Sequence, residues 1–366
     1  MKDFALERYF AKHEFSARYL LSSSDCDGYS QSYVLERATP LERAAWENLT
    51  LGYTESTGSL ALRQAIATFY THASEEDVVV SSPGELSYAT MQVLLAADSP
   101  HVIATFPAYQ SLYEPARALG CDVSFWEPDP TNWTFDTDRL RSLIRPNTRL
   151  IIINFPHNPT GAYLTNSQLL EVVDIARQCG AYLYSDEMYR DLLLDPSCPS
   201  VPPVSDLYEK GISLWGMAKS FGLAGLRIGW LVSQDRAFLA RVTAFKDYLS
   251  ICSSAPSEVL ATIALRHPHD FLDPNVAKIR RNRDLFAASL DKLPCFGPFT
   301  PPRCGSVAFV PLRISGSALA FSNALVARTG IMTIPSELFA YPGKYLRIGF
   351  GRANFPEVIH LLANSL

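Results

Sequence analysis

Short apolar runs alternate along most of the chain with segments whose apolar residues recur at helical spacing. Buried strands are predicted at residues 78–81, 101–106, 121–126, 149–154, 181–185, 212–215 and 228–232. Helices are predicted between them at 110–120, 136–144 and 166–179, and a further helix follows the turn after Ser81. This alternation favours an α/β fold, in which a mostly parallel seven-stranded sheet lies between helices on both faces.

The pattern changes after Gln234, where strands become sparse. One long helical stretch is predicted at 235–293, with breaks near Pro256 and Pro268. The other elements expected here are strands at 307–312, 331–334 and 345–351 and helices at 317–329 and 354–366. Few strands and many helices favour a smaller α+β domain. We therefore expect a large domain at 46–250 and a small domain that combines 251–366 with the N-terminal segment 1–45.

The N-terminal segment contains an amphipathic pattern and then a polar run. Residues 1–15 predict a helix with Phe4, Leu6, Tyr9 and Phe10 on or near one face. The run Ser22–Asp25 follows between apolar segments. It either caps a helix at 29–37 or lines the mouth of a pocket with hydroxyl and backbone groups. The second interpretation makes Ser23 and Ser24 candidate substrate contacts.

Composition excludes several classes of function. The chain has 366 residues, of which 48% are hydrophobic and 19% charged, and its net charge is −5. Because no basic block is present, nothing favours nucleic acid or an anionic membrane surface as a partner. No apolar run approaches the roughly 20 residues that span a bilayer, and the charged start differs from a secretory signal. We therefore expect a cytoplasmic protein.

The seven cysteines form neither a CxxC pair nor a Cys/His cluster with metal-ligand spacing. Their odd number and wide separation favour free thiols in a reducing compartment. The histidines at 157, 267 and 269 are interpreted as structural or solvated. We predict no metal site.

The stretch SLWGMAKSFGLAGLRIGWL, at 213–231, contains the first candidate for catalysis. Lys219 lies in the loop between two predicted strands, flanked by small residues that let a bulky ligand approach closely. Partial desolvation at such a point lowers the pKa of a lysine and makes its amine nucleophilic. Arg227, eight residues on, is a fork-shaped donor suited to phosphate. The alternative is a surface lysine in a glycine-rich turn.

The parallel sheet brings other candidates to the same place, because ligands of such sheets lie outside the carboxyl ends of the strands. Those ends supply Gly84, Tyr109, Asn158, Asp186 and Lys219. The turn at Gly84 runs from a strand into a helix, whose first N–H groups are free to bind an anion.

Three motifs in this order resemble the class I/II aminotransferase family of fold type I enzymes, which use pyridoxal 5′-phosphate (PLP). They are HNPTG at 157–161, DEMY at 186–189 and AKSFGLAGLRIGW at 218–230. The resemblance covers nearly the whole chain and implies the PLP transferase fold. The LSSS run at 21–24 also resembles the branch that contains capreomycidine synthase.

The resemblance implies a role for each motif residue. Lys219 would carry PLP as a Schiff base and then move the proton at the substrate Cα. Asp186 would pair with the pyridine nitrogen and keep the ring protonated. Asn158 and Tyr189 would hydrogen-bond the phenolic oxygen of the ring. Without the resemblance, Asp186 is a strand-end cap and Tyr189 a core aromatic.

The resemblance also implies the residues that hold the cofactor phosphate and ring face. Arg227 would clamp the phosphate, and backbone N–H groups at Gly84 and Glu85 would bind it too. Tyr109 would stack on the ring, although a packing role in the loop is the alternative. Tyr53 would reach the phosphate of a partner subunit, which implies a homodimer with shared active sites.

Arg347, in YLRIGFG, matches the arginine that binds the substrate α-carboxylate, and the alternative is a surface arginine on an edge strand. Lys219 and Arg347 together imply an amino acid substrate and a 2-oxo acid acceptor. Transamination is the first hypothesis. PLP-dependent elimination, replacement or cyclisation in specialised biosynthesis is the second, since it begins with the same proton removal. A non-enzymatic sensor is the third, but no helix-turn-helix segment precedes the domain.

Three positions depart from the family pattern. Gly216 and Ala218 stand where many relatives carry serine, and SSPGE replaces a Gly-Ser/Thr turn at 81–85. We expect the phosphate site to depend more on backbone groups, Arg227 and Tyr53, and we expect a specialised biosynthetic enzyme.

Overall fold

The computed structural model describes residues 1–96, 100–198 and 200–365. Its large sheet has seven strands in the order β2-β8-β7-β6-β5-β3-β4, and only β8 runs antiparallel to its neighbours. The strands are β2 Val78–Ser81, β3 His101–Thr105, β4 Asp122–Trp126, β5 Thr148–Asn154, β6 Tyr182–Asp186, β7 Gly211–Gly216 and β8 Gly229–Val232. The predicted α/β fold with a mostly parallel sheet is therefore confirmed.

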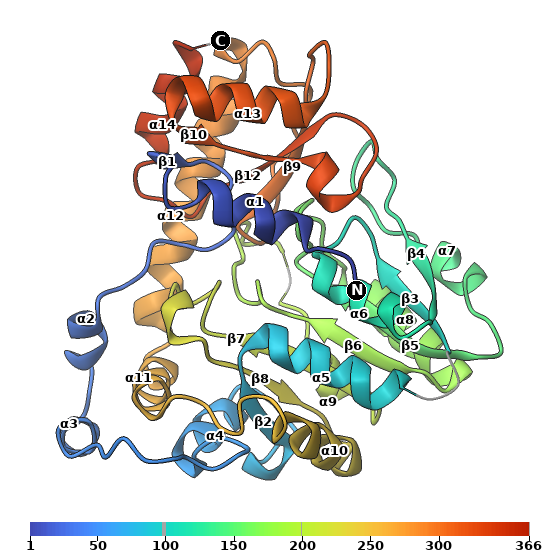
Figure 1. Ribbon diagram of the computed structural model, residues 1–366, viewed down its shortest axis with the longest axis vertical. Helices are drawn as coiled ribbons and strands as arrows, with labels where there is room; N and C mark the ends of the chain where they lie inside the picture. The colour runs from blue at the N-terminus through green and yellow to red at the C-terminus, as the bar shows by residue number, and fades with distance from the viewer. Residues whose placement is uncertain (97–99, 199, 366) are drawn as a thin grey trace.

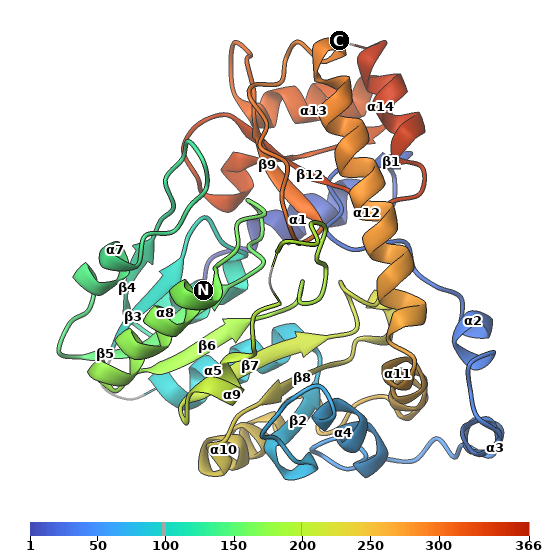
Figure 2. The ribbon, with the colours of Figure 1, turned by 180° about the vertical axis from the view of Figure 1, so that it is seen from behind.

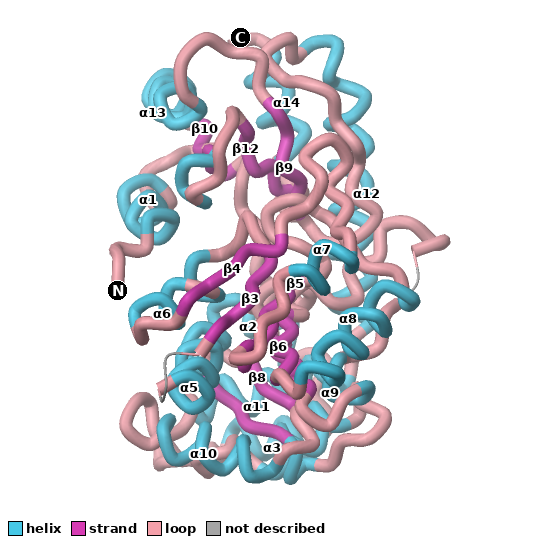
Figure 3. The backbone as a smooth tube through the Cα atoms, turned by 90° about the vertical axis from the view of Figure 1, so that its right-hand side faces the viewer, coloured by secondary structure: helices cyan, strands magenta, loops and turns pink. Residues whose placement is uncertain are grey.

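Helices cover both faces of this sheet, as its apolar strands require. Figure 3 shows α5 and α6 on one face and α7, α8 and α9 on the other. Their bounds are α5 Pro83–Leu95, α6 Glu114–Ala118, α7 Thr137–Ser142, α8 Asn166–Cys179 and α9 Val204–Leu207. At the β2/β8 edge a further apolar cluster packs α4, Leu60–Ala67, against α11, Ala255–Arg266. The remaining helices near this edge are α2 Gln31–Leu35, α3 Pro40–Glu47 and α10 Arg236–Lys246.

A second, smaller sheet lies above the first (Figure 1). It contains β11, β12 and β9, which pair antiparallel, and β1 pairs with β10 beside it. These strands are β1 Tyr19–Leu20, β9 Val307–Pro311, β10 Ile331–Met332, β11 Ile334–Pro335 and β12 Tyr345–Gly349. The prediction of one continuous strand at 331–334 is therefore wrong. Thr333 separates two short strands, β10 and β11, which pair with different partners. The helices here are α1 Ala5–His13, α12 His269–Ser289, α13 Ala318–Thr329 and α14 Phe355–Ala363.

The long helix α12 links the two sheets (Figure 2). Asn275 donates its amide N–H to the carbonyl of Ser220, in the lysine loop, at 3.0 Å. About two helical turns further on, Asn282 donates to the carbonyl of Phe350, after β12, at 2.8 Å. Both asparagines are fully buried, so these bonds fix the lysine loop relative to the small sheet.

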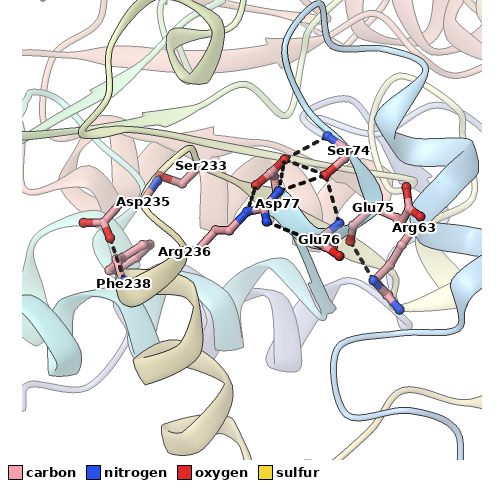
Figure 4. A network of polar contacts seen from close by, with 9 residues as sticks. All are labelled: Arg63, Ser74, Glu75, Glu76, Asp77, Ser233, Asp235, Arg236 and Phe238. Atoms are coloured by element: carbon pink, nitrogen blue, oxygen red, sulfur yellow. Dashed lines mark hydrogen bonds and ion pairs between the residues drawn. The ribbon is translucent and has the colours of Figure 1, made fainter.

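A polar network closes the end of the large sheet that lies away from the strand carboxyl ends (Figure 4). Asp77, just before β2, pairs with Nε of Arg236 at 2.7 Å and accepts from the backbone N–H of Ser74 at 2.9 Å. Burial alone would raise the pKa of Asp77, but the bonds from Arg236 and Ser74 outweigh it and lower the pKa. The network therefore anchors one end of the sheet and leaves the other end to the ligand site.

The described residues 1–96, 100–198 and 200–365 include no helix long and apolar enough to cross a membrane. Within the same ranges, no group of three or more His, Cys, Asp or Glu side chains is placed to hold a metal ion. All seven cysteines are free, as predicted.

Candidate active site

The carboxyl ends of the large sheet open into a cavity of about 420 Å³. Most of the predicted site residues line it, namely Ser24, Gly84, Tyr109, Asn158, Asp186, Tyr189, Lys219, Arg227 and Arg347. They come from separate loops and from both sheets, and the topology alone brings them together. Three predicted residues do not line the cavity: Ser23, Tyr53 and Glu85.

Lys219 follows β7 and extends its amine into the cavity. Its Nζ donates a hydrogen bond to Oγ of Ser24 at 3.0 Å. The next residue, Ser220, is fully buried and donates to the carbonyl of Met188 at 3.2 Å. The buried Ser220 therefore fixes the loop to the segment after β6, while the amine of Lys219 faces the space where a ligand would bind.

Asp186 ends β6 and is only 9% exposed. Its Oδ1 accepts from the backbone N–H of Met188 at 3.1 Å, and among the described residues no donor reaches Oδ2. Burial raises the pKa of Asp186 to about 6, against the lowering effects of the Met188 N–H and Lys219. A desolvated carboxylate with one free oxygen suits a cationic N–H partner, so the cavity fits a protonated pyridine ring.

Arg347, on β12, is 1% exposed and lines the opposite side of the cavity from the large sheet. Its Nε and Nη2 donate to the carbonyl of Ser22 at 3.1 and 2.9 Å, and its Nη1 donates to Oδ1 of Asn158 at 3.1 Å. Burial lowers the pKa of Arg347. No described carboxylate lies within 4.0 Å of the guanidinium. A buried cation with only neutral partners favours an anionic ligand.

The polar run at 22–25 lies between Lys219 and Arg347 and does not cap a helix. The N-cap of α2 is Ser30, whose Oγ accepts from the N–H of Tyr33 at 3.1 Å. The capping interpretation is therefore wrong, and Ser24 and Asp25 line the cavity. Ser23 differs from the expectation, because its side chain is buried and its backbone packs against Gly349, where a Cβ would lie 1.8 Å from the Ser23 carbonyl oxygen.

The expected phosphate end contains Gly84 at the start of α5 and Arg227 after β7. Arg227 adopts φ of 57°, a left-handed conformation that is uncommon for residues other than glycine. Its Nη1 donates to the carbonyl of Ala224 at 3.1 Å, and the rest of its exposed guanidinium is available to an anion. The Glu85 side chain points elsewhere, to Oγ of Ser250 at 2.7 Å, so only its backbone is in position for such an anion.

The structure explains why serine is absent at position 216. Gly216 faces Gly229 across the β7–β8 pair, and Pro83, from the SSPGE turn, packs on both. A Cβ on Gly216 would lie 2.9 Å from Cα of Gly229, and a Cβ on Gly229 would lie 2.6 Å from Cγ of Pro83. The clash at position 216 is therefore with the neighbouring strand's backbone, since Pro83 lies 3.4 Å from that Cβ, and the proline ring excludes a side chain at position 229 instead.

We expect Gly216→Ser to destabilise the protein by about 1–3 kcal/mol, because backbone atoms must move to admit the new Cβ. Urea unfolding of the variant measures this loss. Gly225→Ala is the matched control, since no heavy atom lies within 4 Å of its added Cβ, and its effect should stay within about 0.5 kcal/mol. Equal unfolding midpoints for the two variants would contradict the steric explanation.

The two cavity tyrosines have different surroundings. Tyr109 donates its hydroxyl hydrogen bond to Oε1 of Glu7 at 2.6 Å, and burial followed by the Glu7 charge raises its pKa. Tyr189 is 3% exposed, and no described acceptor or donor reaches its hydroxyl. Tyr53, in contrast, is 88% exposed in the loop before α4, outside the cavity of its own chain.

The sequence analysis missed part of the cavity wall. The acidic side chains of Glu7, Glu14 and Asp25 line it, together with Leu6 and Phe10. Positions 7 and 10 of α1 and its C-cap residue Glu14 share one face, so carboxylates at helical spacing beside apolar residues were the available signal. What it could not supply was the position of α1, which lies between the two sheets (Figure 1).

Sequence comparison places these residues in a known family. The model of the family "aminotransferase class I and II" matches residues 19–362. The chain belongs to this family. It is therefore a PLP-dependent enzyme of the aminotransferase type, and the predicted family, fold class and cofactor are confirmed.

Three similar proteins illustrate the range of this aminotransferase family. Capreomycidine synthase of Streptomyces vinaceus is 31% identical over 360 residues, which cover 96% of this chain and 88% of that protein. The arginine–pyruvate transaminase of Pseudomonas aeruginosa is 29% identical, over 87% of this chain and 82% of its own. The PLP-dependent cyclase OrfR superposes with a TM-score of 0.90 at 25% identity, covering 100% of this chain and 96% of OrfR.

Proposed function

We propose that this enzyme transfers the amino group of an α-amino acid to a 2-oxo acid. The observation that carries the proposal is the presence of one amine, Lys219, and one buried guanidinium, Arg347, in the same cavity as the desolvated carboxyl of Asp186. An α-amino acid requires an anion-binding group beside a proton-transfer group, and this cavity provides both.

Bound PLP would supply the electron sink that stabilises negative charge at the substrate Cα. Arg347 binds the α-carboxylate and so orients the Cα–H bond. Lys219, held by Ser24, carries the cofactor and afterwards moves the proton at Cα. Asp186 pairs with the pyridine N–H, and Asn154 positions it by donating to its carbonyl at 2.9 Å.

The remaining cavity residues hold the other groups of the cofactor. Asn158 and Tyr189 would hold the phenolic oxygen of bound PLP, and Tyr109 would contact its ring. Arg227 and the first N–H groups of α5, near Gly84, would bind its phosphate. These assignments rest on the position of each residue in the cavity wall and on the family pattern.

Cyclisation is the second candidate function. It is supported by two of the similar proteins, which by their names are a synthase of capreomycidine and a PLP-dependent cyclase. The same residues serve both reactions, because each begins when Lys219 removes the proton from Cα. The two reactions differ only in what happens to the substrate after that step.

One half-reaction distinguishes these candidates. If the enzyme is a transaminase, incubation with an accepted amino acid alone converts bound PLP to pyridoxamine phosphate and releases a 2-oxo acid. A screen of amino acids that follows the cofactor absorbance measures this conversion. Release of ammonia, or a cyclised product with the cofactor unchanged, would contradict transamination and support the second candidate.

We also propose that the enzyme is a homodimer in which Tyr53 completes the partner's phosphate site. Tyr53 and Leu51 are exposed beside a second exposed apolar loop, Tyr248–Ile251, and the two loops are joined by Ser56, which donates to Asp247 at 2.6 Å. Exposed apolar surface of this kind typically marks an interface, and a two-fold axis would place each loop near the other subunit.

Tyr53→Phe is therefore expected to weaken PLP binding by about tenfold or more, because a hydrogen bond to a charged phosphate contributes roughly 1.5–3 kcal/mol. Fluorescence titration of the cofactor-free protein gives the Kd, and sedimentation velocity gives the oligomeric state. Tyr88→Phe is the control, since Tyr88 lies on α5 outside both the cavity and the two exposed loops. An unchanged Kd for Tyr53→Phe, or a monomeric wild type, would exclude the shared site.

A further inference from the structure

One face of α1 forms a wall of the cavity that the proposed reaction does not use. Leu6, Glu7, Phe10 and Glu14 recur at helical spacing and all line the cavity. A face that packs against other elements is normally apolar, and Leu6 follows this rule at 1% exposed. Two glutamates on the same face are therefore unexpected unless they face a ligand or solvent in the cavity.

These glutamates belong to a group of three carboxylates that is only partly neutralised. Glu7 accepts from the Tyr109 hydroxyl at 2.6 Å, and Asp25 pairs with Arg352 at 2.8 Å. Glu14 has neither an ion-pair partner within 4.0 Å nor a side-chain hydrogen bond among the described residues. Partial burial, followed by the negative charges of Asp25 and Glu7, raises the pKa of Glu14 against the lowering effects of Arg352 and Lys219. The cavity therefore carries excess negative charge on its α1 side.

An independent observation indicates that the same cavity takes an ionic ligand. Arg347 is fully buried, faces the cavity and has no carboxylate partner within 4.0 Å among the described residues. The protein thus leaves a cation unpaired on β12 and a carboxylate unpaired on α1. Glu7 and Asp25 act on Arg347 only at longer range, so neither forms an ion pair with it. A molecule with an anion and a separate cation neutralises both ends.

We propose that the substrate is an α-amino acid with a cationic side chain, a guanidinium or an ammonium group, which Glu14 binds with help from Glu7 and Asp25. This inference rests on the proposed function, in which Arg347 takes the α-carboxylate and Lys219 the region of Cα. The side chain of such a substrate extends toward α1. One of the similar proteins, the arginine–pyruvate transaminase, has a guanidinium substrate by name.

L-Arginine and L-citrulline test the charge directly, because they differ only in a guanidinium group and a neutral ureido group of nearly the same shape. We expect the PLP-loaded enzyme to bind L-arginine at least tenfold more tightly than L-citrulline, as measured by absorbance titration of the bound cofactor and by calorimetry. L-Lysine against L-norleucine repeats the comparison for an ammonium group. A ratio near one in both pairs overturns the inference.

The variant Glu14→Gln tests whether Glu14 causes the preference for L-arginine over L-citrulline. In this variant we expect the ratio of the Kd for L-citrulline to the Kd for L-arginine to fall at least fivefold. The Kd for L-citrulline itself should stay unchanged. Glu36→Gln is the matched control, since Glu36 is exposed on the far end of α2 and outside the cavity. Equal weakening of both ligands by Glu14→Gln would overturn the role of Glu14, because a structural effect does not distinguish charge.

The failure of this inference is distinguishable from failure of the proposed function. If neutral or acidic amino acids convert the cofactor as well as basic ones do, the proposed function stands and the inference is overturned. If no amino acid in the screen changes the cofactor absorbance or binds in the calorimeter, both are overturned. Tight binding of L-arginine with release of a cyclised product overturns transamination and supports the cationic side chain.

Discussion

Lys219→Ala is expected to lower turnover by about 10³-fold or more and to leave PLP bound without a covalent link. Lys219 is the only lysine among the described residues that line the cavity, so no other amine is placed to carry the cofactor or to move the proton at Cα. The measurement is borohydride reduction of the purified enzyme, followed by peptide mapping. We expect the reduced cofactor on the peptide that contains residue 219 and on no other.

Lys12→Ala provides the control for this variant, because Lys12 is exposed on α1 and lies outside the cavity. Its turnover and its labelling should match those of the wild type. A label on a different lysine, or a Lys219→Ala enzyme with normal turnover, would contradict the assigned role. A colourless wild-type protein that PLP cannot reconstitute would contradict cofactor binding at this cavity.

Asp186→Asn is expected to reduce turnover by about 10²- to 10³-fold and, in the cofactor-free protein, to raise the stability at pH 8. The loss follows because an amide cannot keep the pyridine nitrogen charged. The gain follows from the pKa of about 6, which lies above the ordinary value of 3.8 for the unfolded chain. A folded-state pKa that is raised means that ionisation destabilises the fold, progressively from about pH 4 upward and fully above about pH 6.

Thermal unfolding of the cofactor-free proteins between pH 4 and pH 8 tests the second half of this prediction. The wild type should lose more stability over this range than Asp186→Asn, and their difference should shrink when PLP is bound, since the cofactor supplies a partner for the charge. Asp138→Asn is a control, because that aspartate is exposed on α7, away from the cavity. Parallel pH curves for wild type and Asp186→Asn would contradict the desolvated carboxyl.

The large sheet could be predicted from sequence because its strands are short, apolar and bounded by turns. The strand at 78–81 and the helix at 166–179 match the structure to the residue. Helix ends were less accurate. The long helical stretch at 235–293 is three helices, and the first break, after Lys246, precedes Pro256 by several residues. Apolar spacing continues through such a break, so periodicity alone does not locate it.

The small sheet was harder to predict, because its partners are far apart in the chain. The pairing of Tyr19–Leu20 with Ile331–Met332 joins segments more than 300 residues apart, and two-residue strands carry no periodic signal. The division into domains at 46–250 and at 1–45 with 251–366 stays a prediction. So do the chemical roles of the motif residues, although most of them line one cavity.

Most of the site residues that the sequence analysis found lie at the ends of strong strands or in the loops after them, such as Asp186 and Asn158. Their position followed from the topology of a parallel sheet. Glu7 and Glu14 were missed because a helix pattern predicts which residues share a face but not what that face contacts. Only the packing of α1 between the sheets gives these carboxylates a place in the cavity.

The bonds from Arg347 to Ser22 have a consequence for the order of folding during synthesis. These residues are 325 positions apart, and Ser24, two residues on, holds Lys219. A growing chain can pair its large sheet once β8 has emerged, but the guanidinium that we propose to bind the substrate carboxylate is absent until β12 is made. Until then the carbonyl of Ser22 lacks the hydrogen bonds that Arg347 donates to it in the folded protein. Chains that stop short of β12 would therefore contain the residues that we propose to bind PLP and lack the arginine that we propose to bind the substrate carboxylate.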